Sequence, residues 1–170
     1  VAGFVLFNKM SDDEEKCDCI FQNLEIEKLV GIEFLLMFDE IFKLLQLGIP
    51  DEEFIRGDVP MTKSEVRTIS MAKLDLPTNA VVYDIGAGTG SVSVECAWAA
   101  YDGQVYAIEK EADAAELIRQ NKVKFRTDNL QVIEGLAPDA LAELPAPTHV
   151  FIGGSSGNLR EILTVLLEKN

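Results

Sequence analysis

Short apolar runs alternate with longer amphipathic stretches over most of the chain after residue 48. Four runs rich in branched and aromatic side chains are typical of buried strands, and they cover residues 80–83, 104–108, 130–133 and 149–152. The stretches between and after them predict helices over residues 91–100, 112–123 and 159–168, with a short helix near 138–144. Strands that alternate with helices predict an α/β fold, a parallel sheet with helices on both faces.

The beginning of the chain shows a different pattern. An acidic patch at residues 12–15 precedes apolar residues that fall mostly at helical spacings over residues 24–45, and Gly48-Ile49-Pro50 ends the region. We therefore interpret residues 1–48 as a helical extension and residues 49–170 as a separate domain. An apolar helical face usually packs against its own domain or a neighbouring subunit, and the alternative is a helix that binds a partner.

A further helix is predicted just before the first strand. Thr62-Lys63-Ser64-Glu65 has the form of a capping box, in which a hydroxyl group and a glutamate three positions later satisfy free amides at a helix start. This helix is expected to run to about Lys73, because Leu76-Pro77-Thr78-Asn79 interrupts helical structure before the strand begins.

The strongest local signal is Asp84-Ile85-Gly86-Ala87-Gly88-Thr89-Gly90, which lies between the first predicted strand and the next helix. Glycine lets the backbone turn tightly and lets a ligand approach without a Cβ atom in the way. Free amides at a helix start offer donors to a polar ligand. The third glycine comes one residue earlier than in a dinucleotide fingerprint, and the lysine of a P-loop is missing, so neither of those two sites is expected.

Two acidic residues accompany this loop. Asp84 stands two positions before the first glycine, where it can face a ligand's ammonium group or its ordered water, whereas a pyrophosphate would be repelled. Glu109 ends the second strand and can accept hydrogen bonds from both hydroxyls of a ribose. A ribose-binding carboxylate is shared by NAD-binding and S-adenosylmethionine-binding folds, so it is Asp84 that favours the cofactor carrying an amino acid.

Two more loops follow strand ends. The segment Glu134-Gly135-Leu136-Ala137-Pro138 would lie beside an adenine ring and cover its face, and an ordinary strand-to-helix turn is the alternative. After the fourth strand, a glycine-rich loop would let a large substrate approach the strand ends, and a flexible linker is the alternative. The candidate substrate contacts in this loop are Gly153, Gly154, Ser155 and Gly157.

At these segments the chain resembles the CbiT-type precorrin-6Y (cobalt-precorrin) C15-methyltransferases of the cobalamin pathway, which also decarboxylate their substrate. The resemblance extends from Pro50 to Asn170. The segments that carry it are Gly48–Ile55, Thr62–Arg67, Asp84–Gly90, Tyr106–Glu109, Glu134–Pro138 and Ile152–Gly157. Very many methyltransferases share the glycine loop, whereas the first segment and the loop at 153–157 are more particular to this family.

The resemblance implies a Rossmann-like class I methyltransferase sheet that binds S-adenosylmethionine. Together with Asp84, the implied cofactor contacts are Thr62, Gly86, Ala87, Gly88, Thr89, Gly90, Glu109 and Ala137. It further implies methylation of C15 of a precorrin, removal of carbon dioxide from the C12 acetate arm, and assembly as homo-oligomers, typically tetramers. Family members continue with three more strands, so we expect the sheet to be partial in a chain that stops at Asn170. Residues 1–47 do not match the family's start.

Charge and composition argue against several classes of partner: nucleic acid, a metal ion and a membrane. The formal net charge of −14 argues against nucleic acid, because binding a phosphate backbone needs clustered lysine and arginine. The three cysteines, Cys17, Cys19 and Cys96, form no disulfide framework and no four-ligand metal site, which is typical of a cytoplasmic protein. The most apolar run, residues 34–38, is far too short to span a membrane.

The chemistry implied by the resemblance needs few reactive side chains. A sulfonium methyl group is already activated, so its transfer mainly requires a carbon nucleophile held close and in line. We therefore expect no essential Ser, Cys or His nucleophile, and we interpret His149 and Cys96 as structural residues. Arg56, Lys63 and Arg67 are candidate contacts for a carboxylate-rich substrate. The alternatives are a related methyltransferase acting on RNA or protein, an NAD-binding protein, and a non-catalytic interaction domain.

Overall fold

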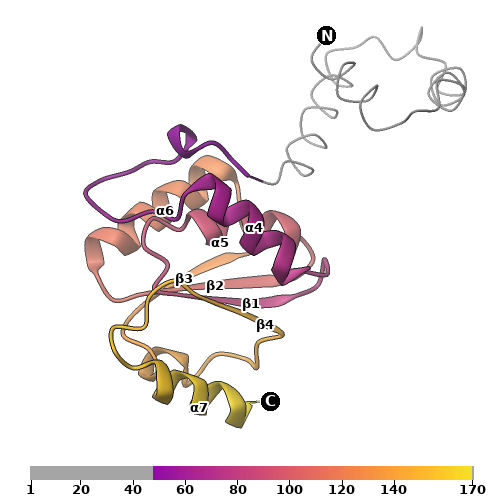
Figure 1. The fold of residues 1–170 in the computed structure, drawn as a ribbon, viewed down its shortest axis with the longest axis vertical. Coiled ribbons are helices and arrows are strands. Elements are labelled where there is room, and N and C mark those ends of the chain that lie inside the picture. Colours follow the sequence, from indigo (N-terminus) through magenta and orange to yellow (C-terminus); the bar gives the residue numbers. More distant parts are fainter. Residues whose placement is uncertain (1–47, 170) are drawn as a thin grey trace, which may run out of the picture. The chain divides into compact units, whose positions relative to one another are not determined.

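The computed structural model describes residues 48–169, so residues 1–47 of the predicted extension and the first two cysteines lie outside the described residues. Four parallel strands form one sheet in the order β3-β2-β1-β4 (Figure 1). The strands are β1 (Val81–Ile85), β2 (Gln104–Glu109), β3 (Leu130–Glu134) and β4 (His149–Ile152). The predicted α/β fold is confirmed, and the predicted strands agree with the observed ones to within two residues at each end.

Helices cover both faces of the sheet, as the alternating pattern predicts. Figure 1 shows three helices on one face and α7 (Leu159–Lys169) on the other. The three helices that share a face are α4 (Ser64–Leu74), α5 (Ser91–Ala99) and α6 (Ala112–Phe125). The short helix expected near 138–144 is confined to a single 3-10 turn, η3 (Asp139–Leu141). None of the helices formed by residues 48–169 is long and apolar enough to cross a membrane.

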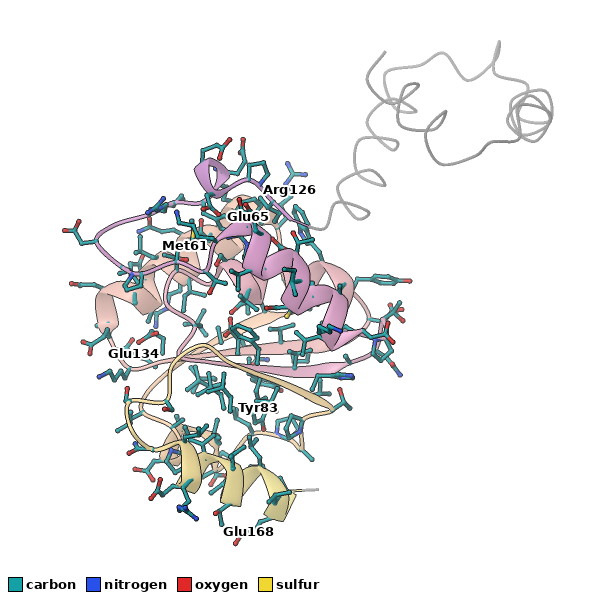
Figure 2. The ribbon with its side chains drawn as sticks, viewed as in Figure 1. Met61, Glu65, Tyr83, Arg126, Glu134 and Glu168 are labelled. Atoms are coloured by element: carbon teal, nitrogen blue, oxygen red, sulfur yellow. The ribbon has the colours of Figure 1, made fainter. Side chains whose placement is uncertain are left out.

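The two faces of the sheet are filled by alternate residues of the same strands. Val82 on β1 and Val105 on β2 belong to the apolar cluster beneath α4, α5 and α6. Their neighbours Tyr83 and Tyr106 belong to the other cluster, which contains Ile162 of α7. Figure 2 shows Tyr83 on the α7 side of the sheet. Side chains of a strand alternate between the faces, so a strand covered on both sides is apolar throughout. This double coverage explains why the two central strands, β1 and β2, are almost entirely buried and mainly apolar.

A segment that we call the strap, residues 48–62, runs along the helical face beside α6 (Figure 1). It contains one 3-10 turn, η2 (Asp51–Glu53). Its apolar side chains join the domain core: Ile49 is buried, and the Phe54 ring lies 4.8 Å from the ring of Phe125 on α6. The strap therefore packs as part of the domain, although the sequence shows no periodic pattern there.

The predicted capping box at the start of α4 is wrong. The helix begins at Ser64 with Lys63 as its N-cap, and no cap side chain bonds to the backbone of its first turn. Instead, the Ser64 amide donates to Asp51 Oδ1 of the strap at 3.0 Å. A carboxylate from the strap thus accepts the kind of hydrogen bond that the sequence motif assigned to Thr62. This is possible because the free amides at a helix N-terminus can donate to any well-placed acceptor.

Candidate functional site

A pocket of about 920 Å³ lies at the carboxyl edge of the sheet. Its floor comprises the ends of the strands and the residues directly after them: Ile85, Glu109, Gly135 and Gly153. The glycine loop forms one wall, and residues 57–62 of the strap form another. Ligands of open α/β sheets bind at this edge, so the pocket lies where the predicted fold places its ligand site.

Each glycine of the loop faces a different neighbour. Gly86, Gly88 and Gly90 all have positive φ angles, of 72°, 58° and 76°, which favour glycine. A Cβ atom on Gly86 would lie 2.5 Å from the carbonyl oxygen of Gly154, and one on Gly88 would lie 2.8 Å from that of Pro60. Gly86 thus admits the loop after β4, and Gly88 admits the strap, so two walls of the pocket depend on these glycines.

The third glycine has a packing role. A Cβ atom on Gly90 would lie 2.9 Å from the Ile118 side chain of α6, and Gly90 is not among the pocket-lining residues. The structure thus places Gly90 against a helix, which differs from the cofactor contact that the resemblance implies. A third glycine that allows close packing of helix against sheet is common in glycine-rich nucleotide loops.

Asp84 and Thr89 lie beneath the loop and do not line the pocket. Both residues are only 1% exposed. Asp84 Oδ2 accepts a hydrogen bond from the Ser93 hydroxyl, whereas Asp84 Oδ1 and Thr89 Oγ1 are buried without a partner in the described part of the chain. Burial raises the pKa of Asp84 to about 6, against the lowering effect of the Ser93 hydrogen bonds. Two buried acceptor groups are therefore available to a polar partner under the loop.

Glu109 lines the pocket and also fixes the backbone around it. Its Oε2 atom accepts from the Gly88 amide at 2.9 Å, and its Oε1 atom accepts from the amides of Lys110 at 2.8 Å and Glu111 at 3.0 Å. A carboxylate offers about four acceptor positions. Oε2, which accepts from one amide, can therefore accept one more hydrogen bond from a ribose hydroxyl. Oε1 already accepts from two amides and would have to lose one of them to bind the second hydroxyl.

The other predicted site residues differ in whether they line the pocket. Those that line the pocket are Thr62, Gly86, Ala87, Gly88, Ala137, Gly153, Gly154 and Ser155. Gly157 does not line it, although its neighbour Ser156 does. The loops after β3 and β4 are joined, because the Asn158 side chain donates to the Ala137 carbonyl oxygen at 3.1 Å. These assignments concern position only, so the individual ligand roles stay predictions.

Sequence reasoning missed most of the strap wall and several acids. Residues 57–61 line the pocket without any motif to mark them. The lining carboxylates are Asp58, Glu109, Glu111 and Asp113, and Lys110 is the one lining cation among the described residues. The pocket is therefore electrostatically negative, a property that favours positively charged ligands.

The proposed cations for a carboxylate-rich substrate lie elsewhere. Arg67 is wrong as a cleft residue: it is fully buried and pairs with Glu95 and Asp51, both at 2.9 Å. Lys63 pairs with Asp51 at 3.0 Å and does not line the pocket, and Arg56 is exposed on the strap outside the lining. A buried arginine needs partners for its charge, which the sequence could not reveal.

A family profile described as a precorrin methyltransferase domain matches residues 53–169. A protein of Sulfurisphaera tokodaii, named a probable cobalt-precorrin-6B C(15)-methyltransferase (decarboxylating), is 48% identical over 119 residues, which are 68% of this chain and 62% of the relative. A protein of Sulfolobus acidocaldarius with the same name is 46% identical over 125 residues, covering 72% and 65%. The chain thus spans less than two thirds of these relatives.

Solved structures agree with the sequence relatives. Precorrin-6Y C5,15-methyltransferase of Geobacter metallireducens has a TM-score of 0.69 and 40% identity, covering 72% of this chain and 65% of that one. A precorrin 8W decarboxylase of Methanobacterium thermoautotrophicum has a TM-score of 0.67 and 38% identity, covering 71% and 66%. An RNA methyltransferase of Salinibacter ruber, at 24% identity and a TM-score of 0.53, shares the fold alone. The fold is therefore the Rossmann-like sheet of class I methyltransferases.

Proposed function

The chain belongs to the precorrin methyltransferase family, and from this membership we propose that its pocket binds S-adenosylmethionine and serves the C15-methylation of a precorrin. We include in the proposal the loss of carbon dioxide from the C12 acetate arm, as a step of cobalamin biosynthesis. The observation that carries the proposal is the pocket at the carboxyl ends of all four strands, with the glycine loop and Glu109 on its walls. The relatives' names supply the substrate class.

The residues present fit this cofactor. Gly86 and Gly88 let the loop after β4 and the strap approach closely enough to form walls of the pocket, and Asp84 Oδ1 and Thr89 Oγ1 are buried acceptor groups without a partner in residues 48–169. The lining carries four carboxylates and one lysine, so it favours a ligand with sulfonium and ammonium groups over one with a pyrophosphate. The negative lining would repel a pyrophosphate, so it supports the cofactor with an amino-acid end.

The walls suggest how the cofactor lies. The free acceptor position of Glu109 Oε2 suits a ribose hydroxyl, and the same oxygen already holds the Gly88 amide. Leu136 and Ala137 line the pocket after β3 and would cover an adenine ring. Thr62, at the end of the strap, and Gly86 to Gly88 would enclose the amino-acid end. The loop at 153–155 then remains for the substrate.

The bound cofactor supplies an activated methyl group, and the chain's own residues supply position. No histidine or cysteine lines the pocket formed by residues 57–156, and His149 begins β4 at the opposite end from the pocket. Cys96 is buried in the core next to Met71. The lining therefore acts by holding two ligands in line, which contributes to the rate by fixing their orientation. Assembly as a tetramer stays a prediction of the family resemblance.

The proposal predicts turnover that mass spectrometry can follow. The 170-residue chain is incubated with S-adenosylmethionine and either precorrin-6B or its cobalt form, and the tetrapyrrole product is analysed. We expect a product that has gained one methyl group and lost one carboxyl group as carbon dioxide. S-adenosylhomocysteine in place of S-adenosylmethionine provides the control, because it carries no transferable methyl group.

The outcomes separate the cofactor from the reaction. A methylated product that keeps the carboxylate of its C12 acetate arm would confirm the methyltransferase and contradict the decarboxylation. Cofactor binding without any product from either tetrapyrrole would contradict the proposed activity of this chain and favour an interaction domain. Methylation of RNA or of a protein side chain under the same conditions would replace the substrate and leave the cofactor site intact.

A further inference from the structure

A single buried amide joins the strap to the glycine loop. Asn121 of α6 is fully buried. Its Oδ1 atom accepts from the Ile55 amide at 2.8 Å, and its Nδ2 group donates to the Ile55 carbonyl oxygen at 3.1 Å and to the Thr89 carbonyl oxygen at 2.9 Å. Both hydrogens and the oxygen of the side chain are thus used, two of the three bonds on the strap and one on the loop.

The strap has few other attachments near the pocket. Residues 56–61 make no backbone–backbone hydrogen bond with any residue in the described part of the chain. The section is held at its two ends, by Asn121 at Ile55 and by Arg67, which donates to the Thr62 carbonyl oxygen. Yet this section lines the pocket and places the Pro60 carbonyl 2.8 Å from where a Cβ atom of Gly88 would lie. Its position over the loop therefore depends on those two hydrogen-bonded anchors and on Met61, which packs against the apolar core.

The two anchors differ in what they touch. Arg67 bonds to the strap and to Glu95 of α5, and it makes no bond to the glycine loop. Asn121 bonds to both the strap and the glycine loop, at Ile55 and Thr89, which precede and follow the residues that line the two walls. Among residues 48–169, Asn121 is therefore the hydrogen-bonded link through which a displacement of one wall reaches the other.

We propose that Asn121 is a positioning residue that sets the distance between strap and glycine loop and so controls the affinity for the cofactor. The inference rests on the proposed cofactor site. Asn121 does not line the pocket and touches no ligand position, so it acts through Ile55 and Thr89. Loss of its amide would leave the Ile55 amide and the carbonyl oxygens of Ile55 and Thr89 without this partner, which favours an alternative, opened strap.

Asn129 provides a matched control. Its side-chain amide also donates to two backbone carbonyl oxygens, those of Ala97 at 3.0 Å and Ala100 at 2.8 Å. It precedes β3, at the amino edge of the sheet, opposite the pocket. Asn129→Ala therefore removes a comparable pair of hydrogen bonds from the same domain without touching either wall, and it reports the effect of lost stability alone.

The test measures S-adenosylhomocysteine affinity by calorimetry and backbone amide exchange in the ligand-free chain. We expect Asn121→Ala to weaken binding about tenfold or more, and Asn129→Ala to change it less than about twofold. In the ligand-free Asn121→Ala chain, exchange should accelerate together at Ile55 and in residues 86–90. Equal affinities in the two variants, or faster exchange at Ile55 alone, would overturn the inference.

If Asn121→Ala fails to fold, amide exchange in the unmodified chain, with and without S-adenosylhomocysteine, tests the same inference. S-adenosylhomocysteine should then slow exchange at the Ile55 amide together with the amides of the glycine loop, because Asn121 couples them. Slower exchange in the loop with no change at Ile55 would overturn the inference. If the unmodified chain binds no S-adenosylhomocysteine, the proposed function fails, while the ligand-free exchange rates still decide whether Asn121 couples the walls.

Discussion

At the scale of single residues, the site depends on groups whose environment the sequence does not display. The motif at 84–90 identifies a nucleotide loop, but it cannot separate the residues that line the pocket from those beneath it. Gly88 lines the pocket, Gly90 packs on Ile118, and Asp84 is buried under the loop. A glycine that lines a pocket and a glycine that packs against a helix are the same letter in the sequence, and a buried aspartate is the same letter as an exposed one. The motif therefore cannot show which role each residue has.

Asp84 predicts a pH dependence of folding. Its pKa is raised to about 6 from 3.8, mainly by burial, so the folded state holds the proton more tightly than the unfolded state. The stability that this provides is complete below the unfolded pKa and is lost as the pH rises through about 6. Between about pH 5 and pH 7, Asp84 should therefore lower the free energy of unfolding by about 1 kcal/mol.

Asp84→Asn removes this titration and keeps an acceptor for the Ser93 hydroxyl. Urea denaturation at both pH values should show that the variant loses about 1 kcal/mol less than the unmodified chain over this interval. Parallel losses in the two proteins would mean that Asp84 is ionised throughout, and the account of its burial would be wrong.

At the scale of elements, the strap is the part of the domain whose placement the sequence pattern does not predict. Strands and helices were predictable because their apolar periods are set by local geometry. The strap has no period, and its placement depends on contacts with residues outside it: Glu95 accepts from the amides of Gly48 and Ile49, and Asp51 accepts from the Ser64 amide. The capping-box motif misidentified the helix start for the same reason, since a pattern of adjacent residues cannot show an acceptor supplied from another segment.

The buried ion pair that holds the strap predicts a large stability effect. Glu95 accepts from Arg67 Nε at 2.9 Å and from the amides of Ile49 and Gly48. Glu95→Ala would remove the buried carboxylate partner of the Arg67 guanidinium and leave Asp51 as its one remaining carboxylate partner among the described residues, and we expect the free energy of unfolding to fall by about 3 kcal/mol. Glu95→Gln keeps an acceptor oxygen and should lose less.

An exposed ion pair supplies the control for this experiment. Glu134 pairs with Arg119 at 3.1 Å, with both side chains nearly half exposed at the periphery of the domain (Figure 2). Glu134→Ala should cost less than about 1 kcal/mol, because water screens such pairs. Chemical denaturation compares the variants, and similar losses at both sites would contradict the anchoring role of Glu95.

At the scale of the whole molecule, the alternation of strands and helices was sufficient to predict the sheet, its two covered faces and the edge that carries the pocket. The parallel order β3-β2-β1-β4 brings Glu109 beside the glycine loop, although the two are separated along the chain by α5. Sequence reasoning found this pair because the ends of parallel strands meet at one edge. The negative charge of the lining was not predictable, because Asp58 comes from the strap.

Titration of the 170-residue chain with S-adenosylmethionine by calorimetry tests the central claim most directly. We predict saturable binding of one cofactor per chain and no detectable binding of NADH. Gly86→Ala should abolish binding, because its Cβ atom would lie 2.5 Å from the Gly154 carbonyl oxygen and displace the loop after β4 that lines the pocket. Absence of S-adenosylmethionine binding by the folded, unmodified chain, or tighter binding of NADH, would contradict the account.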